Sequence, residues 1–199
     1  PNEDTDAFAL GRLAHALVLG GQFAVYEGVR RGKEWDRFKS EQLAAGLTDE
    51  NLYTSAQYAQ ARAMADAVLN DPIAPMYLRG EKEVPMEWTA PTGRRCATRG
   101  IDVLNKERKF LTELKTATCT APGKFGWEAK RFGYHAQAAF YQQACRLAGI
   151  EIEDVYIISV EKKKPYAVTV FHITPRLLLE GDRLCRLWLE TLRTCEEGD

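Results

Sequence analysis

The sequence lacks the defining features of several large classes of protein. Its 199 residues contain no apolar run of the length that a transmembrane helix needs. The N-terminal segment PNEDTDAF has neither the basic nor the apolar region of a secretory signal peptide. Internal repeats, low-complexity tracts and linkers are also missing. We therefore expect a single cytoplasmic domain over residues 1–199, with a core of its own and no membrane partner.

The cysteines lack any pattern that would indicate a disulfide framework or a zinc site. They are odd in number, widely scattered, and no two form a CxxC pair. We expect five free thiols, most of them buried, at Cys96, Cys119, Cys145, Cys185 and Cys195.

Neither sign of charge is in surplus, because 27 Lys and Arg stand against 28 Asp and Glu, for a net charge of −1. The charges are nevertheless segregated along the chain. Residues 94–131 hold ten basic and four acidic side chains, a net of +6, so the rest of the chain carries −7. Such a segment suits a phosphate backbone, although a run of solvated basic side chains is the common explanation.

Apolar spacing and turn residues predict an α/β protein with one mixed sheet and helices on its faces. We expect helices over residues 6–19, 53–70, 128–147 and 175–194, the second of them capped near Thr48–Glu50. Strands are expected over residues 83–88, 101–104, 110–114, 154–160 and 166–173.

The stretch of residues 100–141 carries the clearest chemical pattern. Ten residues separate Asp102 from Glu113, which begins the motif Glu-Leu-Lys ending at Lys115. On a strand Glu113 and Lys115 project from the same side, and antiparallel pairing would bring Asp102 beside them. Two converging carboxylates repel each other and shift each other's pKa unless a cation holds them, and Mg²⁺ prefers such hard oxygen ligands. For a lone match of this kind, an exposed hairpin with ordinary surface charges is the simpler alternative.

Other polar residues occupy suggestive positions on the expected elements. His15 lies two helical turns after Phe8, so it faces the same way as the apolar stripe of the helix. A lone histidine at such a position is usually a core residue. Glu83 and Glu87 share one face of their strand, so either could look toward Asp102. Gln137 and Tyr141 lie four residues apart on one helix face.

Five segments of the chain stand in the order LGRLAHALVLG, RRGKEWDRF, EVPMEWTAPTGRRCATRGID, LTELKTA and YHAQAAFYQQA. Together and in this order they resemble the RecE-like (exodeoxyribonuclease VIII) branch of the PD-(D/E)XK nuclease superfamily, which is related to lambda exonuclease and RecB-type nuclease domains. The resemblance spans nearly the whole chain and joins a GxxxH helix, a D-x10-ExK pair and a QxxxY helix. It implies a restriction-endonuclease-like core, with a central mixed sheet flanked by helices.

This resemblance implies a site for Mg²⁺ or Mn²⁺, and it changes the interpretation of the histidine from core residue to metal ligand. Lys115 would orient or activate the attacking water. The expected metal-binding groups are the side chains of His15, Asp102 and Glu113 and the backbone carbonyl of Leu114.

Further residues take their expected roles from the same resemblance. Glu83 matches the additional acidic position of the catalytic site better than Glu87 does. The QxxxY residues, Gln137 and Tyr141, would contact DNA and support catalysis. For the neighbouring Tyr134 and His135, a surface or hinge role is as open as a catalytic one. The remaining positions expected to contact DNA are Arg99 and Thr116.

The implied activity is that of a metal-dependent exonuclease acting on linear double-stranded DNA, 5′ to 3′, in phage or prophage recombination or in DNA repair. Implied partners are duplex ends, a single-strand annealing recombinase, and further copies of the chain in a closed ring. A four-cysteine iron–sulfur cluster, found in some relatives, is not expected. Because relatives carry a segment before the first helix, we expect either a truncated chain or a shorter relative. The alternatives are a structure-specific or site-specific endonuclease and a non-catalytic DNA-binding module.

Overall fold

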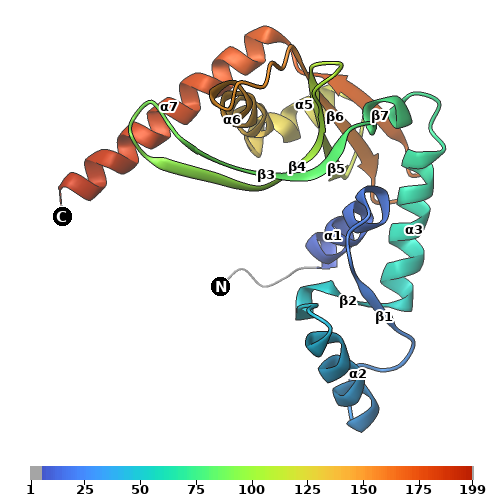
Figure 1. Cartoon of the computed structure of the whole chain (residues 1–199). Coiled ribbons are helices and arrows are strands. Elements are labelled where there is room, and N and C mark those ends of the chain that lie inside the picture. Colours follow the sequence, from blue (N-terminus) through green and yellow to red (C-terminus); the bar gives the residue numbers. More distant parts are fainter. Residues whose placement is uncertain (1–5, 199) are drawn as a thin grey trace.

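The computed structural model describes residues 6–198 and has at its centre a five-stranded sheet in the order β3-β4-β5-β6-β7 (Figure 1). β5 and β6 pair in parallel and the other neighbours pair antiparallel, so the sheet is mixed, as expected. The parallel pair requires a crossover connection, which helices α5 and α6 provide. The strands are β3 (Glu81–Thr89), β4 (Arg95–Asn105), β5 (Phe110–Ala117), β6 (Asp154–Glu161) and β7 (Val168–His172).

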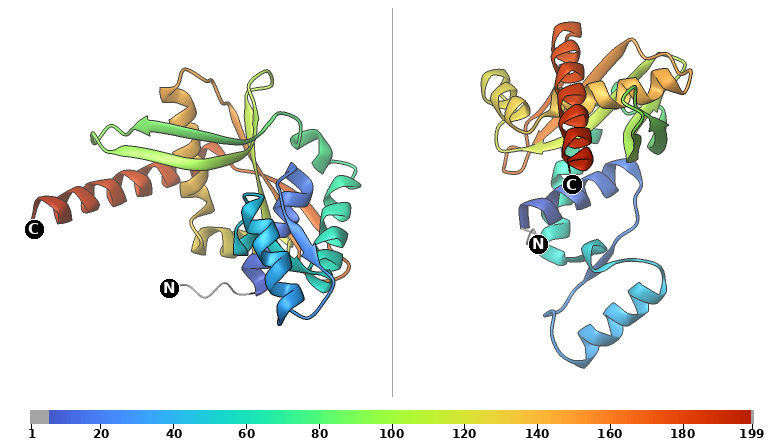
Figure 2. Two further views of the ribbon diagram at one scale, coloured as in Figure 1. Left: turned by 60° about the horizontal axis from the view of Figure 1, so that its bottom comes forward. Right: turned by 90° about the vertical axis from the view of Figure 1, so that its left-hand side faces the viewer.

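Helices cover both faces of this sheet (Figure 2), which confirms the expected fold class. Helices α1, α3 and α4 pack on one face, and α5, α6 and α7 pack on the other. Within residues 6–198, no helix combines the length and the apolar character that crossing a membrane requires. The helices are α1 (Asp6–Leu19), α2 (Lys33–Ala44), α3 (Ser55–Leu69), α4 (Ala74–Tyr77), α5 (Pro122–Arg131), α6 (Tyr134–Leu147) and α7 (Pro175–Glu197).

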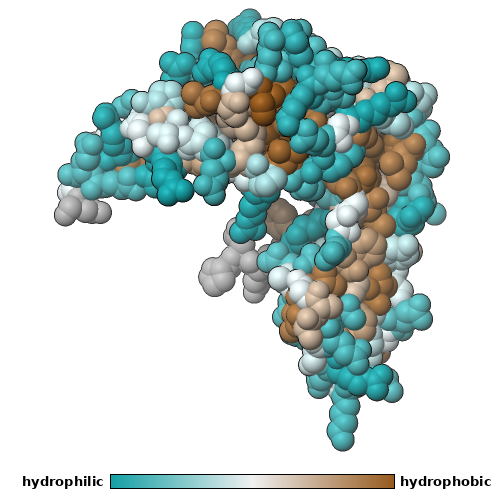
Figure 3. Space-filling model, in the orientation of Figure 1, coloured by the Kyte–Doolittle hydropathy of each residue, from teal (hydrophilic) through white to brown (hydrophobic). Residues whose placement is uncertain are grey.

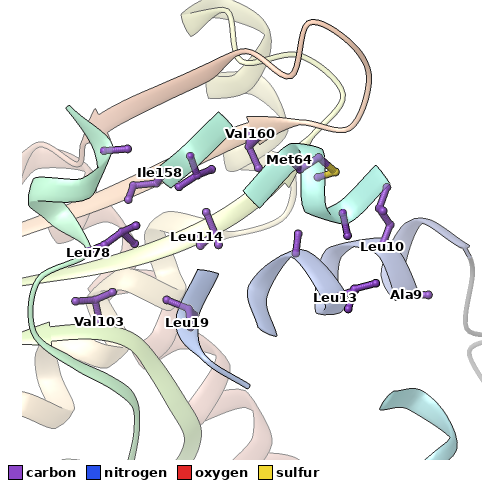
Figure 4. Packing of buried hydrophobic residues seen from close by; sticks show 14 of the residues in the cluster. Ala9, Leu10, Leu13, Leu19, Met64, Leu78, Val103, Leu114, Ile158 and Val160 are labelled. Carbon is purple, nitrogen blue, oxygen red and sulfur yellow. The ribbon is translucent and has the colours of Figure 1, made fainter. Parts of the chain in front are cut away.

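Strand alternation divides the apolar side chains between two cores. On β5, Leu114 points to the core under α1 and α3, whereas Leu111 points to the core under α6 and α7. Ile158 and Ile157 divide in the same way on β6. Figure 4 shows the first core, where α1 and α3 meet the sheet. The strand that carries the ExK motif is therefore fixed from both sides.

The helix expected over residues 128–147 is two helices in the structure. α5 begins earlier, at Pro122, because proline suits the first turn of a helix, where no backbone donor is needed. The helix is interrupted at Gly133, which has a φ of 71° in the left-handed region that glycine enters without strain. Residues 122–127, which lie outside every helix and strand expected from the sequence, are thus helical.

The N-terminal region also differs from expectation. Thr48 begins only the short 3₁₀ turn η1 (Asp49–Asn51), and α3 starts six residues later behind its own capping box at Thr54. A parallel pair of short strands, β1 (Ala24–Tyr26) and β2 (Leu52–Thr54), was not expected.

Two expectations about burial were wrong. Phe8 is 62% exposed, since the buried stripe of α1 runs through neighbouring positions and not through Phe8. Of the five cysteines, which are all free thiols, two are buried, namely Cys145 and Cys185.

The molecule is bent. On one side, α7 and the β3–β4 hairpin project together (Figure 1), joined near their ends by an ion pair between Arg94 and Glu196. On the other side, α2 with β1 and β2 projects from the body. Figure 3 shows the face between these projections as hollowed. α1 and the strands β3–β5 border the inner side of the bend.

Candidate active site

Sheet register places three acidic residues in one row across neighbouring strands. The pairs of β3 and β4 on either side of Glu83 set it opposite Asp102. Continuation of the β4–β5 pairing sets Asp102 opposite Glu113. Because directly opposite residues project from the same face, the three carboxylates are neighbours in space. The row follows from backbone pairing and does not depend on a single flexible side chain.

Backbone amides of β4 and β5 donate hydrogen bonds to the carboxylates of this row. The Leu114 amide donates to Asp102 Oδ2 at 2.6 Å, and the Asp102 amide donates to Glu113 Oε1 at 3.4 Å. Asp102 and Glu113 are both buried. Each carboxylate therefore has one oxygen fixed by the partner strand, which orders the site before any ion is bound.

His15 reaches the row from α1. Its Nε2 lies 2.6 Å from the Leu114 carbonyl oxygen, and its Nδ1 lies 3.7 Å from Asp102 Oδ2. One turn earlier, Gly11 lets the helix approach β5 closely, because a Cβ there would lie 3.3 Å from Thr116 Oγ1. The GxxxH pattern thus has a physical basis, in that the glycine brings the histidine into range of the strand.

Glu83 takes its position through an irregularity in β3. Its φ is 49°, in the left-handed region, and the register between β3 and β4 shifts between Val84 and Met86. On the facing strand, a Cβ at Gly100 would lie 3.1 Å from the Glu83 Cα, so glycine permits this approach. A non-glycine residue in this conformation costs roughly 1–2 kcal/mol, and such strain is often found at functional sites.

The glutamate four residues further on lies elsewhere. Glu87 is exposed and forms an ion pair with Arg95 at 3.3 Å. Exposed and less exposed side chains alternate along β3, with Glu83 and Glu87 both at exposed positions, but only Glu83 belongs to the cluster with Asp102.

His15, Glu83 and Asp102 each offer one ligand atom, and these atoms lie within 4.8 Å of one another. Two carboxylates and an imidazole form a donor set that suits a divalent cation. Glu113 does not belong to this group, and its Oε2 lies 2.8 Å from Lys115 Nζ. The structure therefore brings together two of the expected ligands with Glu83, and places Glu113 beside them, paired with the lysine.

With this geometry in view, the relationship to known proteins is informative. Residues 1–199 match the family described as "PDDEXK-like domain of unknown function (DUF3799)". The chain belongs to this DUF3799 family. No curated protein matches it. Its fold is similar to that of a crystal structure from Eubacterium rectale described as a "putative exonuclease", with a TM-score of 0.73 and 18% identity, over 100% of this chain and 70% of that one. The DUF3799 chain therefore has the fold of PD-(D/E)XK nucleases.

Burial shifts the pKa values of three side chains in this DUF3799 site. Burial raises the pKa of Asp102 to about 6, against the opposing effect of Lys115. Burial also raises the pKa of Glu113 to about 6. Burial lowers the pKa of His15, and Lys115 adds to that effect, so the imidazole is neutral at pH 7. At neutral pH the site offers two carboxylates and a nitrogen lone pair, which is the protonation state that a metal ion needs.

Two lysines flank Asp102. Burial alone would lower the pKa of Lys115, but the charges of Glu113 and Asp102 outweigh it and the net pKa is raised. Sequence reasoning missed Lys82, whose pKa is lowered by burial and whose charge interacts with Asp102. Its Nζ donates to the Leu78 carbonyl. Strict alternation would turn Lys82 away from the face of Glu83, so no pattern in the sequence indicated it.

The residues expected to contact DNA lie on α6, β4 and β5. Gln137 Nε2 donates to Tyr141 Oη at 2.9 Å, and both side chains are half-buried on α6. Arg99 is exposed on β4 beside the register shift, and no ion pair among residues 6–198 includes it. Thr116 is half-buried against Gly11. The QxxxY residues are thus joined to each other, and no hydrogen bond within the described residues joins them to the acidic row.

We expect a divalent ion to stabilise this DUF3799 domain at pH 8 and to lose that effect as the pH falls through about 6, because protons compete for Asp102 and Glu113. In the metal-free protein, these two carboxyl groups should have the opposite effect on the pH dependence of stability. At Asp102 and Glu113 the folded state binds more protons than the unfolded chain between about pH 4 and pH 6, so the contribution of these two groups to stability falls as the pH rises through that window.

Melting temperatures with Mn²⁺ and with EDTA, recorded from pH 5 to pH 8, would measure both trends. An equal Mn²⁺ effect at pH 5 and pH 8 would contradict an ion bound by these carboxylates.

Proposed function

We propose that the chain is a metal-dependent nuclease that hydrolyses phosphodiester bonds of DNA. The observation that carries this proposal is the grouping of ligand atoms from His15, Glu83 and Asp102 within 4.8 Å of one another, beside the Glu113–Lys115 pair. When bound, a divalent cation lowers the pKa of water and neutralises part of the phosphate charge. The two carboxylates and the imidazole would hold that ion.

The residues of the chain divide the remaining work. Lys115 stays protonated at neutral pH, so it places positive charge beside the reacting phosphate and is not the proton acceptor. Glu113 Oε2 lies 2.8 Å from the ammonium nitrogen, and the centre of the Tyr134 ring lies 5.3 Å from it. These two contacts hold Lys115 in one place, so the charge is oriented before the substrate arrives.

Mg²⁺ and Mn²⁺ are the ions that we propose. The carboxylate oxygens suit Mg²⁺, and the nitrogen of His15 makes Mn²⁺ an acceptable substitute. An ion that prefers thiolate ligands has no support, since the cluster contains no cysteine.

For the substrate we propose ends of linear duplex DNA, degraded 5′ to 3′. One support is the similarity of fold to a protein described as a "putative exonuclease". The other is the hollowed face between the two projections of the molecule (Figure 3), which α1 and the strands β3–β5 border. The RecE-like resemblance extends the proposal to a cytoplasmic role in recombination or repair, with an annealing recombinase as partner and a ring of copies around DNA.

Cleavage of linear and circular duplex of one sequence tests this function. With Mg²⁺, linear duplex labelled at each end should lose label from the 5′ ends, while closed circles remain intact and EDTA stops the reaction. Cutting of closed circles would instead indicate an endonuclease on the same fold. Binding without cleavage of either substrate would contradict catalysis.

Changes to the QxxxY pair should affect strand positioning more than chemistry. Tyr141→Phe removes one hydroxyl and with it the hydrogen bond from Gln137, so single-turnover cleavage should fall by about tenfold. Gln137→Ala should cost roughly a hundredfold, because a small error in positioning has a large effect on rate.

Melting temperature measured on the same preparations separates this role from packing. If both variants melt at lower temperature but their folded fraction cleaves at the normal rate, the pair serves only the core.

A further inference from the structure

Helix α5 carries an unusual outer surface. Its buried side rests on Phe125, whose ring stacks on Phe171 at 4.5 Å with an interplanar angle of 15°. The outer side exposes two large rings, Trp127 at 72% and Phe132, just past the helix end, at 59%. We define the α5 surface as these two rings with the exposed cations Lys124, Lys130 and Arg131.

The α5 surface is not neutralised by neighbouring acids. None of the ion pairs within residues 6–198 includes any of its three cations, and Glu128 is the one acidic residue on the helix. The Arg131 guanidinium lies over the Phe132 ring, 5.5 Å from its centre. Exposed rings interleaved with free positive charge are therefore the defining chemistry of this surface.

The α5 surface adjoins the candidate active site through two ring contacts. The exposed Phe132 ring stacks on Tyr134 at 5.9 Å and 25°, and Tyr134 in turn lies 5.3 Å from Lys115 Nζ. α5 also follows the ExK strand after four residues. The right-hand view of Figure 2 shows α5, in yellow, at the outer edge of the body, accessible from outside. A polymer that passes the active site could thus continue over α5.

Unpaired nucleic acid matches this chemistry better than the other polymers do. Its bases present flat faces that stack on aromatic rings, and its phosphates require cations along the path. An intact duplex shows only base edges in its grooves, so it would leave Trp127 and Phe132 unused. Protein interfaces favour aromatic residues and arginine but are depleted of lysine, of which this surface has two.

We propose that the α5 surface binds unpaired nucleotides of the substrate, with bases stacked on Trp127 and Phe132 and phosphates on the three cations. The position of that strand relative to Lys115 rests on the proposed nuclease function. The binding itself does not, because stacking and phosphate contacts need neither a metal ion nor cleavage.

Binding of fluorescein-labelled oligothymidylate of about ten nucleotides, with EDTA present, tests the proposal. Trp127→Ala should weaken binding by about tenfold, and Trp127→Phe should retain most of the affinity because it keeps a stacking ring. Phe132→Ala is a second, independent variant with the same expected direction. The control is Leu69→Ala, which removes a large apolar side chain that is 42% exposed at the end of α3, on the other face of the sheet, and should leave binding unchanged.

The cations are tested by the salt dependence of the same binding. Lys130→Gln combined with Arg131→Gln should reduce the slope of log affinity against log salt by roughly 0.7 for each lost phosphate contact. The Trp127→Ala slope should stay as in the wild type, since stacking releases no counterions.

The outcomes separate this inference from the proposed function. If the protein cleaves DNA but neither Trp127→Ala nor Phe132→Ala weakens oligothymidylate binding, the inference is wrong and the nuclease function stands. If no DNA is cleaved but ring-dependent binding persists, the inference stands and the nuclease function fails. A change in oligomer mass without a change in binding would identify α5 as an interface between copies and overturn the proposal.

Discussion

Asp102→Asn should reduce cleavage by roughly three orders of magnitude or more, because it removes one carboxylate charge from the proposed metal site. Asparagine keeps the shape and can still accept the hydrogen bond from the Leu114 amide, so the pairing of β4 and β5 is preserved. DNA affinity should change little, since the cations outside the site are untouched. Single-turnover cleavage and a binding measurement with EDTA would show both effects.

The same variant should be at least as stable as the wild type when no metal is bound. The raised pKa of Asp102 means that its surroundings disfavour the ionised form, so a neutral amide removes a cost of folding at pH 8. Asp154→Asn is the matched control, since Asp154 lies in the same sheet but pairs with His172, which is not one of the proposed metal ligands. Normal cleavage by purified Asp102→Asn would remove this residue from the mechanism.

Lys115→Ala should lower the rate of the chemical step by roughly three orders of magnitude while DNA binding changes little. The ammonium is held between Glu113 and the Tyr134 ring, so its loss removes a fixed positive charge from the reacting phosphate. It also leaves the buried Glu113 without its partner, which should raise the pKa of that carboxyl further.

The acidic limb of the pH–rate profile should therefore move to higher pH in Lys115→Ala. A purely structural role for the lysine would lower the melting temperature without moving that limb. Lys109→Ala provides the comparison, because Lys109 is a lysine whose partners, Glu151 and Glu153, lie outside the site.

Strand alternation was sufficient to predict much of the site from the sequence. Glu113 and Lys115 had to share a face, and the short turn before β5 implied the antiparallel pairing that brings Asp102 beside them. The longer helices and the five strands of the central sheet were also predictable, because periods of 3.6 and 2 differ clearly over such lengths.

The remainder depends on features that periodicity does not contain. His15 could not be told from a core histidine, since its role depends on the approach of α1 to a strand 99 residues away. Alternation allowed both Glu83 and Glu87 to face Asp102, and the positive φ of Glu83 and the register shift after Val84, which distinguish the two, are not visible in the residue pattern. The division of α5 from α6 depends on the backbone conformation of Gly133, one glycine in a segment that holds several.

The measurement that tests the central claim most directly is Mn²⁺ binding, by titration calorimetry at pH 8, to the wild type, Glu83→Gln and Glu87→Gln. The two glutamates lie on the same strand, but only Glu83 belongs to the cluster with His15 and Asp102. We expect Glu83→Gln to weaken Mn²⁺ binding by roughly tenfold or more and Glu87→Gln to leave it unchanged. Equal affinity in all three proteins would contradict a metal centre at His15, Glu83 and Asp102.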